Sequence, residues 1–136
     1  MIRQILISLF FILSACTTTK TEEKIDLVSP VVEEDFYIIE GENEPLDTLL
    51  AQKGKVLIAY SDCYQCHREE NRAKGPSFSA IAKRYPLQKS YIELLSRKII
   101  SGGSGTWGYP VMSAHPKLSE TEARSMVTYI LSMDVK

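Results

Sequence analysis

The sequence predicts a small all-α domain that begins near Leu46 and continues to the end of the chain. Between these points apolar residues recur three and four positions apart in several segments, which is the period of an amphipathic helix. Glycine or proline separates the segments, and the last one opens with a capping-box pattern. The chain has 136 residues, enough for one domain once the N-terminal segment described below is set aside.

The first helix is predicted to start near Leu46 and to run into a turn at Cys63. Its apolar stripe consists of Leu46, Leu49, Leu50, Leu57 and Tyr60. Gly54 lies in the middle of this helix, where a glycine costs about 1 kcal/mol relative to alanine. We therefore expect Gly54 to have a packing reason.

Two more helices are predicted in the middle of the domain. The first follows Gly75-Pro76, carries Phe78, Ile81, Ala82 and Tyr85, and ends near Pro86. The second starts near Lys89 or Ser90, runs through Tyr91, Leu94, Leu95 and Ile99, and stops at Gly102.

The last helix is predicted to begin with Ser119 and Glu122, whose side chains can form a capping box. Its apolar face consists of Ala123, Met126, Val127 and Ile130. Residues 101–112 lie before it and hold four of the seven glycines in the chain. Such a segment cannot be a helix.

Residues 1–15 have the features of a secretory signal peptide. Arg3 precedes an apolar stretch, Ile5 to Leu13, which only Ser8 interrupts. This stretch is too short to span a bilayer, which needs about 20 apolar residues. Leu13-Ser14-Ala15-Cys16 resembles the lipobox of bacterial lipoproteins, so we expect Cys16 to carry a lipid anchor. The alternative is a free or disulfide-bonded Cys16.

Residues 16–45 are predicted to form an acidic tether. They carry nine Asp or Glu and two Lys, a net charge of −7, whereas residues 46–136 have a net charge of +5. As a random coil, residues 17–45 would span on the order of 30 Å. The apolar run Phe36-Tyr37-Ile38-Ile39 could instead dock on the domain. The chain lacks the charge excess that marks a nucleic-acid binder.

The segment Cys63-Tyr64-Gln65-Cys66-His67 has the C-x-x-C-H pattern of c-type haem attachment. Two sulfurs three residues apart lie on one face of a helical turn, where they can bond to the two vinyl groups of one haem. His67 stays on that face and can ligate the iron. We therefore expect four to five short helices to enclose one covalently bound haem c.

Three other interpretations of these residues remain open. A thioredoxin-like redox pair would need a strand–helix–strand setting that the sequence does not show. A structural zinc site would need His115 as its fourth ligand. A disulfide between Cys63 and Cys66 would leave His67 unexplained. The export signal favours haem, because it supplies the compartment in which c-type haem is attached.

Met112 is predicted to be the second ligand of the iron. It lies in the glycine-rich segment, whereas Met126 and Met133 lie at core spacing in the last helix. His115 competes for this role, since imidazole also binds haem iron well. Otherwise His115 is a surface histidine before Pro116.

The chain from about Leu46 to Met133 resembles the small monohaem class I cytochromes c of bacteria. The resemblance rests on the C-x-x-C-H motif, Gly75-Pro76, Trp107-Gly108, Met112 and the final helix. It implies that the Pro76 carbonyl accepts the Nδ1–H of His67. It also implies that Trp107 packs beside the haem and donates its indole N–H toward a propionate; the alternative is an ordinary core aromatic residue. Many relatives flank the methionine with prolines, where this chain has Val111 and Ser113.

The predicted function is one-electron transfer between redox proteins by a single-haem cytochrome that is not an enzyme. With both axial positions of the iron filled, no site remains for a substrate. Cationic side chains that could steer an acidic partner are Lys74, Lys83, Arg84 and Lys117; the alternative is that they are ordinary solvated surface residues. The anchor would hold the domain at the cell envelope, in the periplasm or on an outer-membrane face. The alternative function is a haem peroxidase or gas-binding sensor with a labile methionine ligand, although no obvious distal acid–base pair is present.

Overall fold

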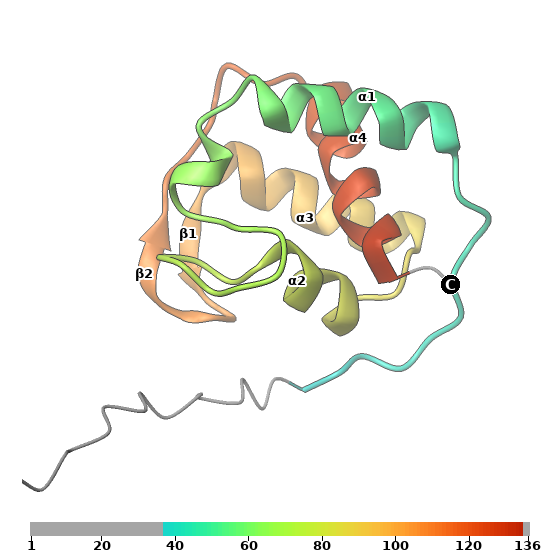
Figure 1. The fold of residues 1–136 in the computed structure, drawn as a ribbon, viewed down its shortest axis with the longest axis horizontal. Helices are drawn as coiled ribbons and strands as arrows, with labels where there is room; N and C mark the ends of the chain where they lie inside the picture. The colour runs from blue at the N-terminus through green and yellow to red at the C-terminus, as the bar shows by residue number, and fades with distance from the viewer. Residues whose placement is uncertain (1–36, 135–136) are drawn as a thin grey trace, which may run out of the picture. The chain divides into compact units, whose positions relative to one another are not determined.

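Four helices and one two-stranded hairpin make up residues 37–134, the part of the chain that the computed structural model describes (Figure 1). The helices are α1 (Thr48–Ala59), α2 (Phe78–Arg84), α3 (Lys89–Ser101) and α4 (Glu120–Leu131), with 3-10 turns η1 (Cys63–Gln65) and η2 (Ser132–Asp134). The predicted helical class is confirmed. The predicted signal peptide, Cys16 and residues 17–36 lie outside the described residues.

Helices α1 and α4 cross in close contact at Gly54 (Figure 1). A Cβ atom built on Gly54 would overlap the Ser125 carbonyl and would lie 2.9 Å from the Met126 nitrogen. Only a glycine allows the two backbones to approach this closely. The packing reason expected for Gly54 is confirmed.

The buried face of α1 matches the predicted stripe only in part. Ala51, Gly54 and Ile58 are buried, whereas the side chains of Leu49 and Tyr60 are 77% and 91% exposed. Leu46, Leu50 and Leu57 are half-buried, so the prediction is right for these three residues and wrong for Leu49 and Tyr60. The close contact at Gly54 fixes the side of α1 that faces α4.

Helices α2 and α3 begin and end as predicted. The Ser77 hydroxyl caps α2 by accepting the Ala80 N–H at 3.1 Å, and α3 ends at Gly102, which has a φ of 67°. Phe78 and Ala82 of α2 are buried. In α3 the expected apolar residue Leu94 is exposed instead.

Helix α4 lies between two parts of the core. The Ser119–Glu122 capping box is present, and all four apolar residues predicted for its inner face are buried. One core cluster consists of Ile58, Phe78, Met126 and Ile130. The other consists of Tyr85, Leu87, Val127 and Leu131. Both clusters depend on α4 for half of their members.

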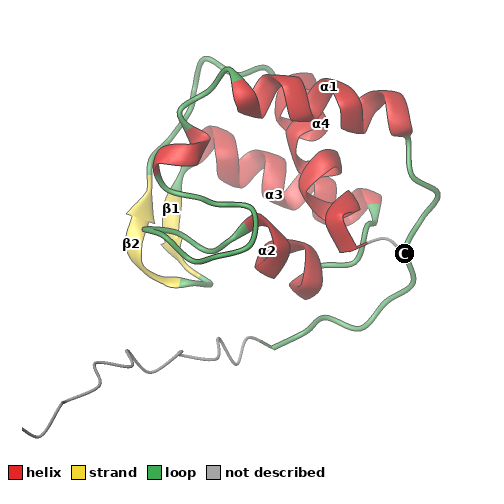
Figure 2. Cartoon of the chain, viewed as in Figure 1, coloured by secondary structure: helices red, strands yellow, loops and turns green. Residues whose placement is uncertain are grey.

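The glycine-rich segment forms an antiparallel hairpin, which the sequence did not predict (Figure 2). Strand β1 (Gly103–Gly105) pairs with β2 (Gly108–Met112), with Gly103 opposite Met112 and an irregular register between the two ends. Gly105 and Gly108 flank the turn with φ values of 120° and 74°, which favour glycine. The hairpin was missed because a three-residue Gly-Ser-Gly strand has no apolar alternation.

Residues 37–46 pack across the connection between α2 and α3. The Ile39 N–H donates to the Arg84 carbonyl at 2.9 Å, and the Glu44 N–H donates to the Leu87 carbonyl at 2.7 Å. Ile39 also contacts the second core cluster, while Tyr37 and Ile38 are exposed. Part of the segment assigned to the tether thus lies on the domain. No helix within residues 37–134 is long and apolar enough to cross a membrane.

Candidate functional site

A cavity of about 410 Å³ lies between η1, α3, the hairpin and α4. Its lining includes every site residue predicted within the described part of the chain: Cys63, Cys66, His67, Pro76, Trp107 and Met112. Most of the remaining wall is apolar and comes from residues such as Ile58, Phe78, Leu95 and Ile99. Volume and lining are those of a cofactor site.

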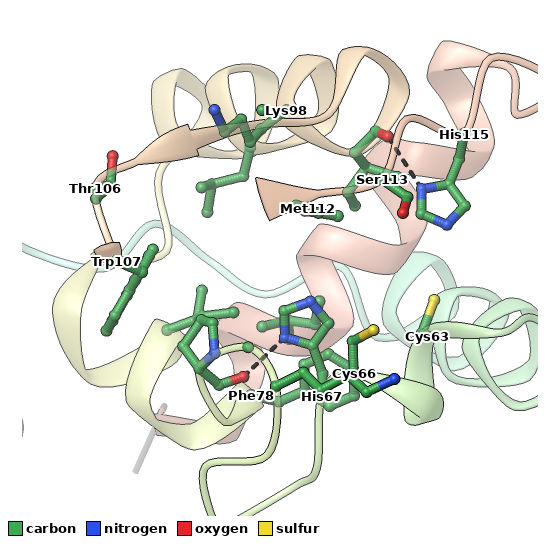
Figure 3. A pocket seen from close by; sticks show the side chains of 18 of the residues that line it. Cys63, Cys66, His67, Phe78, Lys98, Thr106, Trp107, Met112, Ser113 and His115 are labelled. Carbon is green, nitrogen blue, oxygen red and sulfur yellow. Dashed lines mark hydrogen bonds between the residues drawn. The ribbon is translucent and has the colours of Figure 1, made fainter. Parts of the chain in front are cut away.

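The two cysteines lie at one end of this cavity (Figure 3). Turn η1 places them together, because the Cys63 carbonyl accepts the N–H groups of both Cys66, at 3.1 Å, and His67, at 2.9 Å. Both thiols are free, Cys63 partly buried and Cys66 exposed. Burial, and then the negative charge of Asp62, raise the pKa of the Cys63 thiol, so this group is neutral at neutral pH.

The imidazole of His67 is fixed by a hydrogen bond. Its Nδ1 lies 2.8 Å from the Pro76 carbonyl oxygen, the contact that the resemblance implied. A carbonyl only accepts, so Nδ1 carries the proton and Nε2 of the neutral ring keeps its lone pair. A lone pair on Nε2 is what a metal ligand requires.

Two neighbours of His67 were not singled out from the sequence. A Cβ atom on Gly75 would lie only 2.7 Å from Cε1 of the imidazole, so the ring rests against the bare backbone of Gly75. Phe78 stacks on the imidazole with ring centroids 5.5 Å apart and an interplanar angle of 15°. Gly75 and Phe78 lie eight and eleven positions from His67 in the chain. A short sequence motif does not predict contacts over that separation.

Met112 lies across the cavity from His67 (Figure 3). It is the last residue of β2 and is partly buried. Gly102 lies behind it, where a Cβ atom would be 2.7 Å from both the Met112 carbonyl oxygen and the Ala114 nitrogen. The positive φ of Gly102 and this close approach both require glycine there.

His115 also lines the cavity, but both of its ring nitrogens face other acceptors. Nδ1 lies 3.3 Å from the Ile99 carbonyl oxygen, and Nε2 lies 3.2 Å from Oδ1 of Asp62. Met112, and not His115, is the side chain opposite His67 (Figure 3). The geometry therefore favours Met112 over His115 as the second ligand.

Cationic side chains gather around Trp107, which lies at the other end of the cavity from the cysteines (Figure 3). The Arg84 guanidinium lies 5.1 Å from the centroid of the Trp107 ring, and Arg72 donates to the Trp107 carbonyl at 3.4 Å. Lys98, not predicted as a site residue, donates to the Ser104 carbonyl at 3.3 Å. This end of the cavity suits anionic groups.

Trp107 is partly buried and contacts the second core cluster, so it is both a core residue and a wall of the cavity. Of the four cations expected on the surface, Lys74, Lys83 and Lys117 are exposed. Arg84 is half-buried and also lies over the Tyr85 ring, 5.5 Å from its centroid. Arg84 therefore belongs to the packing around Trp107.

These residues fit a haem better than the alternatives. Two thiols at one end of an apolar cavity, with an imidazole and a thioether on its opposite sides, match the attachment and ligand groups of haem c. Within residues 37–134 no three His, Cys, Asp or Glu side chains converge as a metal site, which leaves the zinc alternative without ligands there. The same residues contain no strand–helix–strand unit, which the thioredoxin-like alternative would need.

Comparison with known proteins agrees with this fit. A family model described as cytochrome c matches residues 51–134. Cytochrome c-551 of Azotobacter vinelandii is 33% identical over 81 residues, which are 60% of this chain and 98% of that protein. Cytochrome c-552 of Hydrogenobacter thermophilus is 34% identical over 77 residues, which are 57% of this chain and 78% of that protein. The solved structure of Nitrosomonas europaea cytochrome c552 matches with a TM-score of 0.55 and 29% identity, over 59% of this chain and 99% of that one.

Proposed function

Because the chain belongs to the cytochrome c family, we propose that Cys63 and Cys66 attach its haem and that His67 and Met112 ligate the iron. As a class I cytochrome c the protein carries one covalently bound haem c and transfers electrons, and it is not an enzyme. The observation that supports the residue assignment best is the placement of His67 and Met112 on opposite sides of one apolar cavity with both thiols at its end.

The residues around the iron suit one-electron transfer. When bound, the haem supplies an iron that gains and loses one electron. His67 and Met112 would both hold that iron, which would leave it no open position for a substrate. The thioether of Met112 and the apolar wall favour the ferrous state and raise the reduction potential. The hydrogen bond from His67 to Pro76 keeps the imidazole oriented in both oxidation states.

The electron partner is proposed to be a protein with an acidic docking surface. Residues 46–136 have a net charge of +5, and Lys74, which is exposed, lies at the cavity itself. Complementary charge steers such encounters and makes their rate fall with salt, while the interface stays small and short-lived.

The cellular setting is proposed from the N-terminal sequence. Cleavage before Cys16 and lipidation of its sulfur would anchor the domain to a membrane of the cell envelope, in the periplasm or on an outer-membrane face. Mass spectrometry of the N-terminal peptide of the exported protein tests this. A peptide that starts at Cys16 and carries acyl chains is expected; any other N-terminus without lipid would contradict the anchor.

Visible spectroscopy of the exported protein tests the haem ligands. We expect a low-spin ferric spectrum with a methionine–iron charge-transfer band. Met112→Ala should abolish the band, while His115→Ala should retain it because His115 is not the ligand. A low-spin wild-type spectrum that lacks the band, together with a change to high spin in His115→Ala, would assign the second ligand to His115 instead. A high-spin wild-type spectrum that responds readily to carbon monoxide would instead indicate a sensor or an enzyme.

A further inference from the structure

The chain that follows Met112 has little regular structure to hold it. Strand β2 ends at Met112, residues 113–119 contain no helix or strand, and α4 begins only at Glu120. Ser113 and Ala114 are both exposed. Beyond the pairing of Met112 with Gly103 in the hairpin, the position of the Met112 side chain therefore depends on a small number of contacts made by this segment.

His115 provides most of these contacts. Its backbone N–H donates to the carbonyl oxygens of Ile99, at 3.1 Å, and Ile100, at 3.2 Å, near the end of α3. Its side chain makes the contacts to Ile99 and Asp62 described above. Since Asp62 directly precedes Cys63, one residue links the Met112 segment both to α3 and to the turn that carries the cysteines.

The contact between His115 and Asp62 requires the imidazole to be the hydrogen-bond donor. The Asp62 carboxylate and the Ile99 carbonyl both only accept, so a neutral His115 ring can donate to one of them, and the bond to Asp62 requires the proton on Nε2. Side-chain exposure is 23% for His115 and 61% for Asp62, so the bond is partly shielded on the imidazole side. A charge-assisted bond of this kind is stronger than a neutral one.

We propose that His115 is a positioning residue that acts through Asp62 to keep Met112 on the iron. The proposal rests on the proposed assignment of Met112 as ligand. An external ligand such as imidazole replaces the methionine when the iron–sulfur bond breaks and an iron–nitrogen bond forms, with no change of oxidation state. The hydrogen bond between His115 and Asp62 resists the outward movement of residues 113–115 that this exchange requires.

The test is the rate at which imidazole displaces Met112 from the ferric protein, followed by stopped-flow loss of the methionine–iron band. His115→Leu and Asp62→Ala each remove one partner and should raise the rate about threefold to tenfold. The double variant should match the single variants, because both changes remove the same bond. His115→Gln keeps an N–H donor at similar reach and should return the rate to within about twofold of wild type. Arg124→Leu, which breaks the ion pair with Glu93 at 3.7 Å, is the matched control and should change nothing.

The outcomes distinguish a wrong assignment of Met112 as ligand from a wrong role for His115. A wild-type ferric protein without the methionine–iron band would overturn the Met112 assignment and the role of His115 with it. A wild type with the band, together with unchanged rates in His115→Leu and Asp62→Ala, would overturn the role of His115 alone. Rate effects that multiply in the double variant, or that His115→Gln does not reverse, would also overturn it.

Discussion

Gly75 determines how the His67 ring sits. The imidazole lies against its bare Cα, with Phe78 stacked on the ring and the Pro76 carbonyl as hydrogen-bond acceptor. A side chain on Gly75 would compete with the ring for the same space. The glycine thus serves the ligand directly and not only the turn before Pro76.

Gly75→Ala should displace the His67 imidazole. The added Cβ would lie 2.7 Å from Cε1, so the ring must rotate or residues 75–76 must shift, and either movement strains the 2.8 Å hydrogen bond to Pro76. We expect a loss of about 1–3 kcal/mol in the free energy of unfolding by guanidinium, with a changed reduction potential. Asn71→Ala, at an exposed position of the same loop, is the control. A Gly75→Ala protein with wild-type stability and potential would contradict the role of Gly75.

The sequence could predict the proposed ligands, and the hydrogen bond from His67 to Pro76, but not the other contacts that hold these side chains. Cys63, Cys66 and His67 form a local motif, and Met112 is notable because it lies among glycines. Gly75 and Phe78 reach His67 only through the folded loop, and Asp62 meets His115 across 53 positions of the chain. Contacts of this kind depend on the fold, so the sequence carries no short-range signal for them.

At the scale of elements, the sequence predicted where the helices lie better than how they face. All four helices occur where apolar periodicity placed them. The inward face of α1 was predicted only in part, because Leu49 is exposed and Gly54, which has no apolar side chain, makes the closest contact with α4. A prediction from apolar periodicity gives most weight to large apolar side chains. Two helices that cross closely need a small residue at the crossing point.

Gly54→Ala should destabilise the protein although alanine favours helices. The gain in helix propensity is about 1 kcal/mol, whereas a Cβ atom would overlap the Ser125 backbone and force α1 and α4 apart. We expect a net loss of about 1–3 kcal/mol in thermal or denaturant unfolding. Gln52→Ala, at an exposed position of α1, should stay within about 0.5 kcal/mol of wild type. An equally stable Gly54→Ala protein would show that the helices can separate at no cost.

Ser119→Ala should destabilise α4 in a pH-dependent way. Hydrogen bonds from the side chain and backbone N–H of Ser119 lower the pKa of the Glu122 carboxyl. A carboxyl with a lowered pKa in the folded state contributes stability above its ordinary pKa, and that contribution is lost as the pH falls through the lowered value.

Loss of the N-cap itself should cost about 1 kcal/mol at neutral pH. The difference between wild type and Ser119→Ala should then shrink as unfolding is measured from about pH 6 down to about pH 3. Glu120→Gln, in the same first turn but outside the capping box, is the control. A difference that stays constant over this range would contradict the coupling to Glu122.

For the whole molecule, the cavity implies that the domain needs its haem to be stable. Much of the cavity wall is apolar, and without the porphyrin this surface is not buried against a partner. A small domain has little stability to spare for the loss of such burial. The described residues alone cannot be expected to hold such a space open.

The variant Cys63→Ala with Cys66→Ala, produced without haem attachment, should therefore be at best marginally folded. Circular dichroism should show reduced helicity and a broad thermal transition, because the cavity walls collapse or open without the porphyrin. The matched control is the wild-type protein with haem attached, which should melt sharply. A native-like helical spectrum with a sharp melt in the haem-free variant would contradict this prediction.

The contact between Gly54 and Ser125 joins the first helix of the domain to its last. During synthesis, α1 leaves the ribosome long before α4 exists, and both core clusters lack half of their members until α4 arrives. The domain therefore cannot complete its fold co-translationally from the N-terminal end. If the chain is exported as proposed, it would therefore still be unfolded enough to pass a translocation channel, and its Cys63–His67 segment would stay accessible for the proposed haem attachment.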